Sequence, residues 1–343
     1  MIMSFQFLQV LWFILIAVII LGWATMDGFD YGVGSLLAFI AKDDREKKIV
    51  INSIGPVWDG NQVWLILGGG AIFAAFPQVY ASVFSGFYLA MMLVVWLIIF
   101  RAVSFEFRSR IEDESWKKRW EIVITVTGLG IGLLLGVALA NVLRGIPLNK
   151  EHVDFESLFG LLNIFAIVGG LISLSMFLMH GSAYLVMKTE GELRKRARNY
   201  GTKFAYAYII LTLIFLLISP IFAPRLLNNG LGILGDLVPA IMLIGAIGVI
   251  LAMKSNSDIR PFMFSVLSII GTVASVAVGL FPDIVPSTIK SSYSLTLFNS
   301  SSNELTLVVM LIATLIGLPL VILYSIYAYK RFGLKVKLDE DSY

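Results

Sequence analysis

The stretch between Lys48 and Arg101 contains no lysine or arginine and consists mostly of apolar residues. It is about twice as long as the roughly 20 residues that cross a bilayer as one helix. Similar apolar runs alternate with short charged segments along the rest of the chain, which is 58% hydrophobic and 14% charged. With a mean hydropathy of +0.87, the chain is expected to be an all-α integral membrane protein with many spans.

Apolar windows between the charged segments define nine candidate transmembrane helices. Their approximate ranges are 7–40, 53–75, 79–100, 119–143, 158–187, 203–221, 232–253, 261–281 and 305–329. We expect Phe76-Pro77-Gln78 to fold the long first stretch into a tight hairpin, because proline interrupts a helix. Residues 1–343 are expected to form one membrane domain, with helical bundles over 1–145 and 155–283 and a peripheral last helix over 304–331.

Basic residues concentrate in alternate predicted loops. The loops at 42–48, 101–119, 188–203 and 330–337 hold most of the 26 lysine and arginine residues. Since loops rich in lysine and arginine stay in the cytoplasm, the N-terminus is predicted outside and the C-terminus in the cytoplasm. Termini on opposite sides require an odd number of spans, and nine meets that requirement.

Three aspartates fall inside the predicted spans. Counted at 1.5 Å per residue, Asp30 lies roughly 18 Å from Lys42 and Asp59 roughly 16 Å from Lys48, with Asp27 one turn beyond Asp30. Asp27 and Asp30 share a helix face because they are three residues apart. A charge at this depth costs roughly 2.5 to 3.5 kcal/mol, so such residues usually have a function or a partner. We expect the three carboxylates to line one cavity and to act as a proton relay.

A structural role for these polar residues is the alternative. Each carboxylate could instead be held by backbone amides or by Asn61, Gln62 and Trp64, which would tie together helices that glycines interrupt. His180 could likewise relay protons or hold two helices together through a hydrogen bond. The residue pattern leaves both interpretations open.

Arg101 begins a charged group that also contains Glu106, Arg108 and Arg110. The group marks the predicted cytoplasmic end of the third helix. An ion-paired membrane edge is the simpler interpretation, and an access site for protons or anionic lipids is the alternative.

Four glycines, Gly128, Gly130, Gly132 and Gly136, lie within one apolar span. Small residues at this spacing allow two helices to approach closely. A phosphate-binding glycine loop would follow a strand, and no strand is predicted here. The run therefore predicts a helix-to-helix contact.

The supply of metal ligands is small, because the chain has no cysteine and only two histidines, His152 and His180. Thiolate metal sites, iron–sulfur clusters and disulfides are thereby excluded. A haem with two histidine ligands needs both at one depth, so we do not expect this chain to ligate haem or copper by itself. The net charge of +3 arises from basic residues at predicted membrane edges, so no nucleic-acid partner is expected.

Several motifs follow one another in order across nearly the whole chain. They are DGFDYGVG at 27–34, NSIGPVWDGN at 52–61, GGAIFAAFP at 69–77, FRAVSFEFR at 100–108, HGSAYLVMKTEGE at 180–192 and FPDIVP at 281–286. In these segments the chain resembles subunit II of the cytochrome bd-type quinol oxidases. The resemblance implies a subunit of a terminal oxidase of aerobic respiration, which oxidises membrane quinol and reduces dioxygen to water.

The resemblance also implies a division of labour between chains. In that family two b-type haems and one d-type haem belong to subunit I, so this chain is expected to be haem-free and not catalytic by itself. Expected partners are subunit I, quinol, membrane lipid and a small third subunit, in the cytoplasmic membrane of a bacterium. The loop at 286–303, rich in serine and asparagine, either contacts an accessory subunit or has no such role, and the sequence leaves both open.

Residue roles follow from the same motifs. The expected cytoplasm-facing proton route toward the haems of subunit I consists of Asp27, Asp30 and Asp59. Candidate contacts with a quinone or with the partner subunit are Trp58, Arg101 and His180. 

Two other functions fit the residue pattern without the resemblance. A stand-alone proton-coupled transporter would also place carboxylates at mid-membrane beside interrupted helices. A purely structural membrane scaffold is the third hypothesis. The transporter predicts solute movement by the chain alone, whereas the oxidase subunit predicts haem absorbance only when its partner is present.

Overall fold

The computed structural model describes residues 4–152, 159–228, 232–333 and 335–338, and regular structure in them is almost entirely helical. The α-helices are α1 (Phe5–Ile40), α2 (Asp44–Ile54), α3 (Trp58–Ala75), α4 (Pro77–Gly86), α5 (Tyr88–Arg108), α6 (Glu114–Arg144), α7 (Ile164–Lys188), α8 (Gly191–Phe222), α9 (Ile233–Met253), α10 (Arg260–Leu280) and α11 (Glu304–Phe332). The remaining elements are the 3-10 helices η1 (Pro224–Asn228) and η2 (Ser291–Tyr293) and the short strands β1 (Asp283–Val285) and β2 (Leu295–Thr296).

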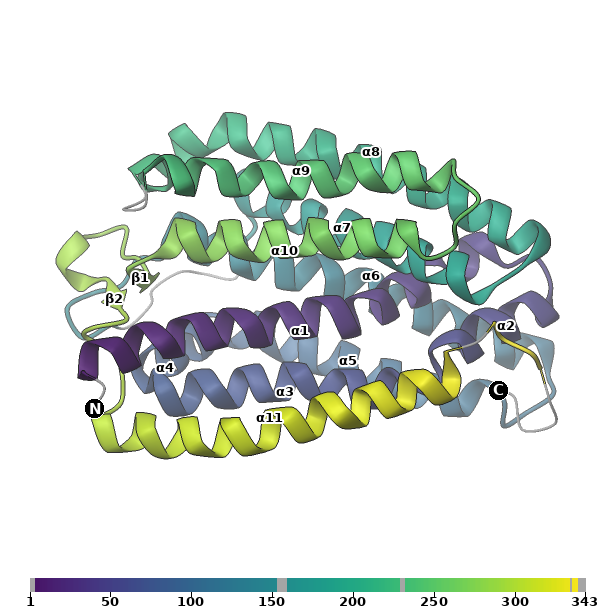
Figure 1. The fold of residues 1–343 in the computed structure, drawn as a ribbon, viewed down its shortest axis with the longest axis horizontal. Helices are drawn as coiled ribbons and strands as arrows, with labels where there is room; N and C mark the ends of the chain where they lie inside the picture. Colours follow the sequence, from purple (N-terminus) through teal and green to yellow (C-terminus); the bar gives the residue numbers. More distant parts are fainter. Residues whose placement is uncertain (1–3, 153–158, 229–231, 334, 339–343) are drawn as a thin grey trace.

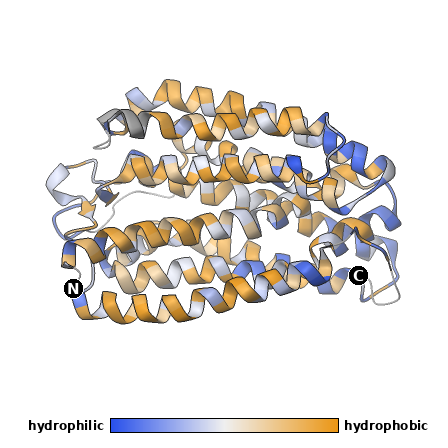
Figure 2. Cartoon of the chain, in the orientation of Figure 1, coloured by the Kyte–Doolittle hydropathy of each residue, from blue (hydrophilic) through white to orange (hydrophobic). Residues whose placement is uncertain are grey.

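The long helices run side by side along one axis (Figure 1). Helix α1 begins at one end of this bundle and α11 ends at the other, close to α2. Figure 2 shows apolar residues along the middle of the helices and hydrophilic residues gathered at their ends, above all at the end where α2 lies. An apolar middle with polar ends is the arrangement that a bilayer requires.

Seven helices of the described chain are long and apolar enough to cross a membrane: α1, α5, α6, α7, α8, α10 and α11. An eighth crossing results if α3 and α4, which meet at 119°, are counted as one bent span. The predicted fold class, an all-α multi-pass membrane protein, is therefore confirmed. 

The predicted helix over 53–75 is wrong at its beginning. The chain forms α2 first, breaks at residues 55–57 and starts again as α3 at Trp58. Helix α2 is capped by Asp43, whose side chain accepts from the backbone N–H of Glu46 at 2.8 Å. The break coincides with Pro56, which has no N–H to donate to the preceding helical turn, and with Val57, whose backbone leaves the helical conformation. Depths counted from Lys48 through one continuous helix therefore do not apply.

The predicted turn at residues 76–78 is present, but the helix expected over 79–100 is divided. Phe76 alone separates α3 from α4, and Pro77 occupies the first turn of α4, where its missing N–H costs nothing. Phe87 then separates α4 from α5. Helix α5 continues to Arg108, so Arg101 lies within a helix and not in a cytoplasmic loop.

Small residues allow the central helices to touch. A side chain at Gly32 of α1 would place Cβ 1.9 Å from the carbonyl oxygen of Phe177 in α7, and Gly181 lies against the same backbone. A Cβ at Gly136 of α6 would lie 2.4 Å from Cβ of Ser173 and 2.9 Å from the carbonyl oxygen of Gly169, both in α7. The predicted helix contact through the glycine run of α6 is thereby confirmed.

Outside this centre the packing is looser. Helix α11 lies at the edge of the bundle (Figure 1), and Leu307 is its one fully buried residue in the described structure. Strands β1 and β2 pair in antiparallel fashion, with Asp283 opposite Thr296, within the segment that precedes α11. The expected grouping of the helices into bundles over 1–145 and 155–283 stays a prediction.

Candidate functional site

Residues 27–37 of α1 are buried without interruption, so neighbouring helices surround this part of α1 on every side. The acids Asp27 and Asp30 both lie in this segment and are completely buried. The glycine contacts with α7 bring the surrounding helices close, which leaves no room for bulk solvent. Each carboxylate must therefore find its partners within the protein.

Asp27 pairs with Arg101 of α5. Nη1 of Arg101 lies 3.4 Å from Oδ1 of Asp27, and the hydroxyl of Tyr31 donates to Oδ2. The guanidinium also lies over the Tyr31 ring, 4.6 Å from its centroid, and 5.8 Å from the Trp58 ring. Arg101 is itself only 1% exposed, so this ion pair is buried inside the bundle and Arg101 is not part of the ion-paired membrane edge that the sequence favoured.

Asp30 has different partners from α3 and α11. The amide nitrogen of Asn61 donates to Oδ2 of Asp30 at 2.7 Å, and the hydroxyl of Tyr329 donates to the amide oxygen of Asn61 at 2.7 Å. Oδ1 of Asp30 is buried and has no hydrogen-bond partner among the described residues. Asp30 thus keeps one oxygen available for a proton or a water molecule.

We call Asp27, Asp30 and Arg101, with the hydroxyl and amide groups that contact them, the buried charge cluster. It contains two carboxylates and one guanidinium. With both acids ionised its net charge is negative by one, and with one acid protonated it is neutral. Because an uncompensated charge is costly at low dielectric, the arrangement can hold one exchangeable proton.

The structure does not bring Asp59 into the buried charge cluster. Asp59 lies in the first turn of α3 and its side chain is exposed. Asn61, two positions later, points inward to Asp30, and positions two apart on a helix face nearly opposite directions. The expectation that three carboxylates line one cavity is therefore wrong for Asp59, because α3 starts afresh at Trp58 and turns this acid outward.

Trp58 is half-buried beside the cluster, with its ring 5.3 Å from that of Phe105. His180 lies elsewhere, fully buried in α7. Its Nδ1 is 2.7 Å from the hydroxyl of Ser265 in α10, and its Nε2 is 2.9 Å from the carbonyl oxygen of Thr25 in α1. His180 therefore joins three helices, which is the structural role that the sequence left open beside the relay.

Several cluster residues could not be identified from the sequence. Tyr329 is one of several tyrosines near the end of α11, and nothing in their spacing distinguishes it. The partner of Arg101 lies on another helix, so the pairing gives no local signal. Asn61 was named only in the alternative, structural interpretation as a possible partner of the carboxylates, and the structure shows that it donates to Asp30.

A second ionic group lies at the end of the bundle near α2. Arg108 of α5 is 2.6 Å from Asp44 and 2.8 Å from Glu121, and Lys47 also contacts Glu121 at 2.8 Å. Burial pushes the pKa of Asp44 up, but the hydrogen bond and charge of Arg108 outweigh it and hold this pKa below its ordinary value of 3.8. The predicted ion-paired edge is thus confirmed for Arg108.

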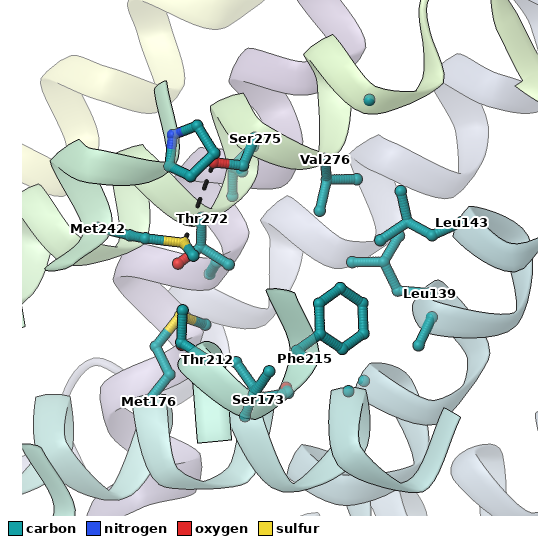
Figure 3. A pocket seen from close by; sticks show the side chains of 18 of the residues that line it. Leu139, Leu143, Ser173, Met176, Thr212, Phe215, Met242, Thr272, Ser275 and Val276 are labelled. Carbon is teal, nitrogen blue, oxygen red and sulfur yellow. Dashed lines mark hydrogen bonds between the residues drawn. The ribbon is translucent and has the colours of Figure 1, made fainter. Parts of the chain in front are cut away.

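An apolar cavity of about 390 Å³ lies among α1 and α6 to α10 (Figure 3). Figure 3 shows Phe215, Leu139 and Met176 directed into it. Its wall includes Trp23, whose ring lies 6.3 Å from that of Tyr31, the residue that donates to Asp27. The residues proposed from the sequence as quinone contacts are not in the described lining of this cavity.

The described residues offer few ligands for a metal ion or a haem iron. No group of three or more histidine, cysteine, aspartate or glutamate side chains that could hold a metal ion occurs in the part of the chain that the structure describes. Both ring nitrogens of His180 are engaged by Ser265 and Thr25. The site residues therefore do not fit a haem ligand set.

Comparison with known proteins identifies the family of this chain. The family model described as "Cytochrome bd terminal oxidase subunit II" matches residues 8–332. The chain belongs to this family. The match confirms the family resemblance that the sequence motifs indicated, and it covers almost the whole of this chain.

Curated relatives agree over their full lengths. The chain is 35% identical to "Cytochrome bd-I ubiquinol oxidase subunit 2" of Escherichia coli (strain K12), with 98% of this chain and 97% of the relative covered. It is 33% identical to "Cytochrome bd ubiquinol oxidase subunit 2" of Bacillus subtilis (strain 168), with 96% and 97% covered. It is similar in fold to a chain of the bd oxidase from Geobacillus thermodenitrificans, with a TM-score of 0.79 at 17% identity over 95% of this chain and 98% of that one.

Proposed function

We propose that this chain is the haem-free second subunit of a bd-type terminal oxidase, which oxidises membrane quinol and reduces dioxygen to water. It contributes a scaffold and a cytoplasm-facing proton route toward the haems that subunit I holds. Family membership and the names of the full-length relatives support the assignment to such a complex. The buried charge cluster supports the proton route, because two buried acids that share one arginine can exchange one proton.

The proposal includes nine spans in the cytoplasmic membrane, with the N-terminus outside and the C-terminus in the cytoplasm. Helix α9 supplies the ninth span beside the seven straight helices and the bent pair of α3 and α4. It has 21 residues and a length of about 31 Å, which matches the roughly 30 Å hydrocarbon core. The first helix, α1, begins at one end of the bundle and the last helix, α11, finishes at the other, which is consistent with an odd number of crossings (Figure 1).

Within the cluster the two acids take different roles. Asp27 carries the fixed negative charge, because Arg101 and Tyr31 both stabilise its ionised form. Asp30 gains and loses the proton, because its one polar partner in the described structure is a neutral amide and its Oδ1 is open to protonation. Asp59 lies near the level of Asn61 but on the exposed side of α3. In the complex subunit I would cover Asp59 and would receive protons from it.

The partners follow from the same assignment. Subunit I covers the surface around Asp59 and Trp58, quinol is the electron donor of the complex, and membrane lipid surrounds the remainder. A small third subunit contacts the loop at 286–303. Arg101 lies too deep for a direct partner contact, and His180 is enclosed by helices of this chain.

The test uses the complex purified from detergent with its co-purifying chains identified. Replacing Asp30 with asparagine should slow quinol-driven oxygen consumption at least tenfold, while haem absorbance and assembly are retained. Glu112→Gln is the matched control, because Glu112 is an exposed acid in the loop between α5 and α6, where it pairs with Lys117. Full activity in Asp30→Asn would refute the relay.

A stand-alone proton-coupled transporter is the second candidate, supported by mid-membrane acids beside interrupted helices. It predicts that liposomes containing this chain alone move a solute when a proton gradient is applied. The oxidase subunit predicts no such movement, no haem absorbance in the isolated chain, and haem absorbance when the partner co-purifies.

A further inference from the structure

Tyr329 belongs to a helix that has few ties to the rest of the protein. Near its start, α11 accepts a hydrogen bond at the Leu307 carbonyl from the indole N–H of Trp12, at 3.0 Å. Near its end, the Tyr329 hydroxyl reaches inward to Asn61 at 2.7 Å, one residue before the basic pair that begins at Lys330. The hydrogen-bonded chain from Tyr329 through Asn61 to Asp30 therefore connects the end of α11 to a completely buried acid.

The direction of each hydrogen bond follows from the chemistry of the groups. An ionised Asp30 can only accept, so the amide nitrogen of Asn61 must face it. The amide oxygen of Asn61 then needs a donor, and the phenol of Tyr329 supplies one. If the amide turned over, its oxygen would face the carboxylate and two acceptors would meet, which is tolerable only when Asp30 carries its proton on Oδ2.

We propose that Tyr329 is a positioning residue for Asp30: because a phenol donates a hydrogen bond more readily than it accepts one, Tyr329 favours the orientation of the Asn61 amide in which Oδ2 accepts, and Oδ1 is then the oxygen that takes the exchangeable proton. The inference rests on the proposed relay role of Asp30. Protonation forms one O–H bond at Oδ1 and removes one negative charge, with hydronium as the proton source. Release returns the proton to water and restores the carboxylate.

A small cleft beside Tyr329 supports this arrangement. It lies between α3 and α11, has a volume of about 10 Å³ and is lined by both Asn61 and Tyr329. That volume is close to the space one water molecule needs. The outer end of the hydrogen-bonded chain thus meets a place where a water can solvate the phenol oxygen without disturbing the amide.

Loss of the Tyr329 hydroxyl should have a defined effect on Asp30. In Tyr329→Phe the amide is free to turn and accept a hydrogen bond from protonated Asp30. This bond replaces the one that Asn61 donated, and because a carboxylic O–H is the stronger donor, the exchange should raise proton affinity by about 2- to 10-fold, so the midpoint of protonation should move up by about 0.3 to 1 pH unit. The other charged or titratable groups that face Asp30 are Asp27, Arg101 and Tyr184, and the substitution leaves all three in place.

The experiment is infrared difference spectroscopy of the purified oxidase complex over a pH series. The C=O band of protonated Asp30 is identified by its loss in Asp30→Asn. Tyr329→Phe should shift this band to higher wavenumber, because the carbonyl oxygen no longer accepts from Asn61, and should raise its pH midpoint. Tyr327→Phe, which removes an exposed phenol from the same helix, should change neither.

A second variant distinguishes the loss of this hydrogen bond from a general loss of α11 packing. Asn61→Leu removes the donor to Asp30 while leaving the Tyr329 ring, and it should shift band and midpoint in the same directions. Unchanged band and midpoint in both variants would overturn the positioning role while leaving the relay intact. Full quinol oxidase activity in Asp30→Asn would instead overturn the relay on which the inference rests.

Discussion

Arg101 is the residue whose loss should destabilise the buried charge cluster most. Its guanidinium is almost completely buried, and Nη1 lies 3.4 Å from Oδ1 of Asp27. At an effective dielectric of about 20, two unit charges at this distance attract by about 5 kcal/mol. Removing one member of a buried pair costs about 3–5 kcal/mol, because the other charge is left without compensation. Arg101→Gln should therefore lower the stability of the chain by a similar amount.

A double-mutant cycle separates this charge effect from lost packing. Asp27→Asn alone leaves the arginine beside Asp30, and Asp27→Asn with Arg101→Gln removes both charges of the pair. We expect the double variant to be more stable than the sum of the single effects predicts, by about 2 kcal/mol, as for other residues in direct contact. Arg110→Gln is the control, because Arg110 is an exposed arginine beyond the same helix.

The assay is the thermal unfolding midpoint of the purified complex in detergent, at one fixed scan rate because unfolding of such assemblies is irreversible. Arg101→Gln should show the lowest midpoint, the double variant an intermediate one, and the Arg110 variant no change. Strictly additive single effects, or an Arg101 variant as stable as the Arg110 control, would refute the reasoning that the pair compensates buried charge.

Three further predictions concern packing, helix ends and pH. Gly32→Ala should cost about 1–3 kcal/mol or more, since its Cβ would meet α7 backbone, whereas Gly70→Ala, which has nothing within 4 Å in the described structure, should be nearly neutral in thermal unfolding. Arg198→Lys should speed hydrogen exchange after α9, because lysine cannot replace the fork that bonds carbonyls at 253, 255 and 257. Arg108 lowers the pKa of Asp44 below 3.8, so the stability that the ionised Asp44 contributes is complete above pH 3.8 and is lost as the pH falls through the lower folded-state pKa. Asp44→Asn should therefore have a lower thermal unfolding midpoint at neutral pH and should not show this loss of stability in acid.

The long apolar helices were the predictable part of the fold. The expected ranges 232–253 and 261–281 agree with α9 and α10 to within a residue, because apolar length and flanking charges determine where a span begins and ends. The expected range 203–221 covers only part of α8, which begins at Gly191, since a helix can continue into the charged segment beyond the membrane. A hydropathy window identifies only the apolar part of a helix, so it does not predict the charged part that continues beyond the membrane.

The breaks and the partners of the buried acids were less predictable. Gly55-Pro56 lies in one of the recognised motifs, but the motif did not reveal that α3 would begin anew at Trp58. As a result the Asp59 side chain is exposed, whereas we expected it to face the cavity with Asp27 and Asp30. Arg101 followed an apolar run and therefore resembled a membrane edge, although its acid partner on α1 draws it into the interior. Pairings between distant helices depend on three-dimensional packing, which spacing along one helix does not encode.

The central claim is that Asp30 passes protons toward the partner subunit. The direct measurement is the rate of proton uptake from the vesicle interior during a single turnover of the complex, reconstituted with its cytoplasmic side inward and followed with a trapped pH dye. For Asp30→Asn we predict uptake slowed at least tenfold while electron transfer from quinol to the haems begins at its normal rate. Proton uptake as fast as in the unmodified complex would contradict the account.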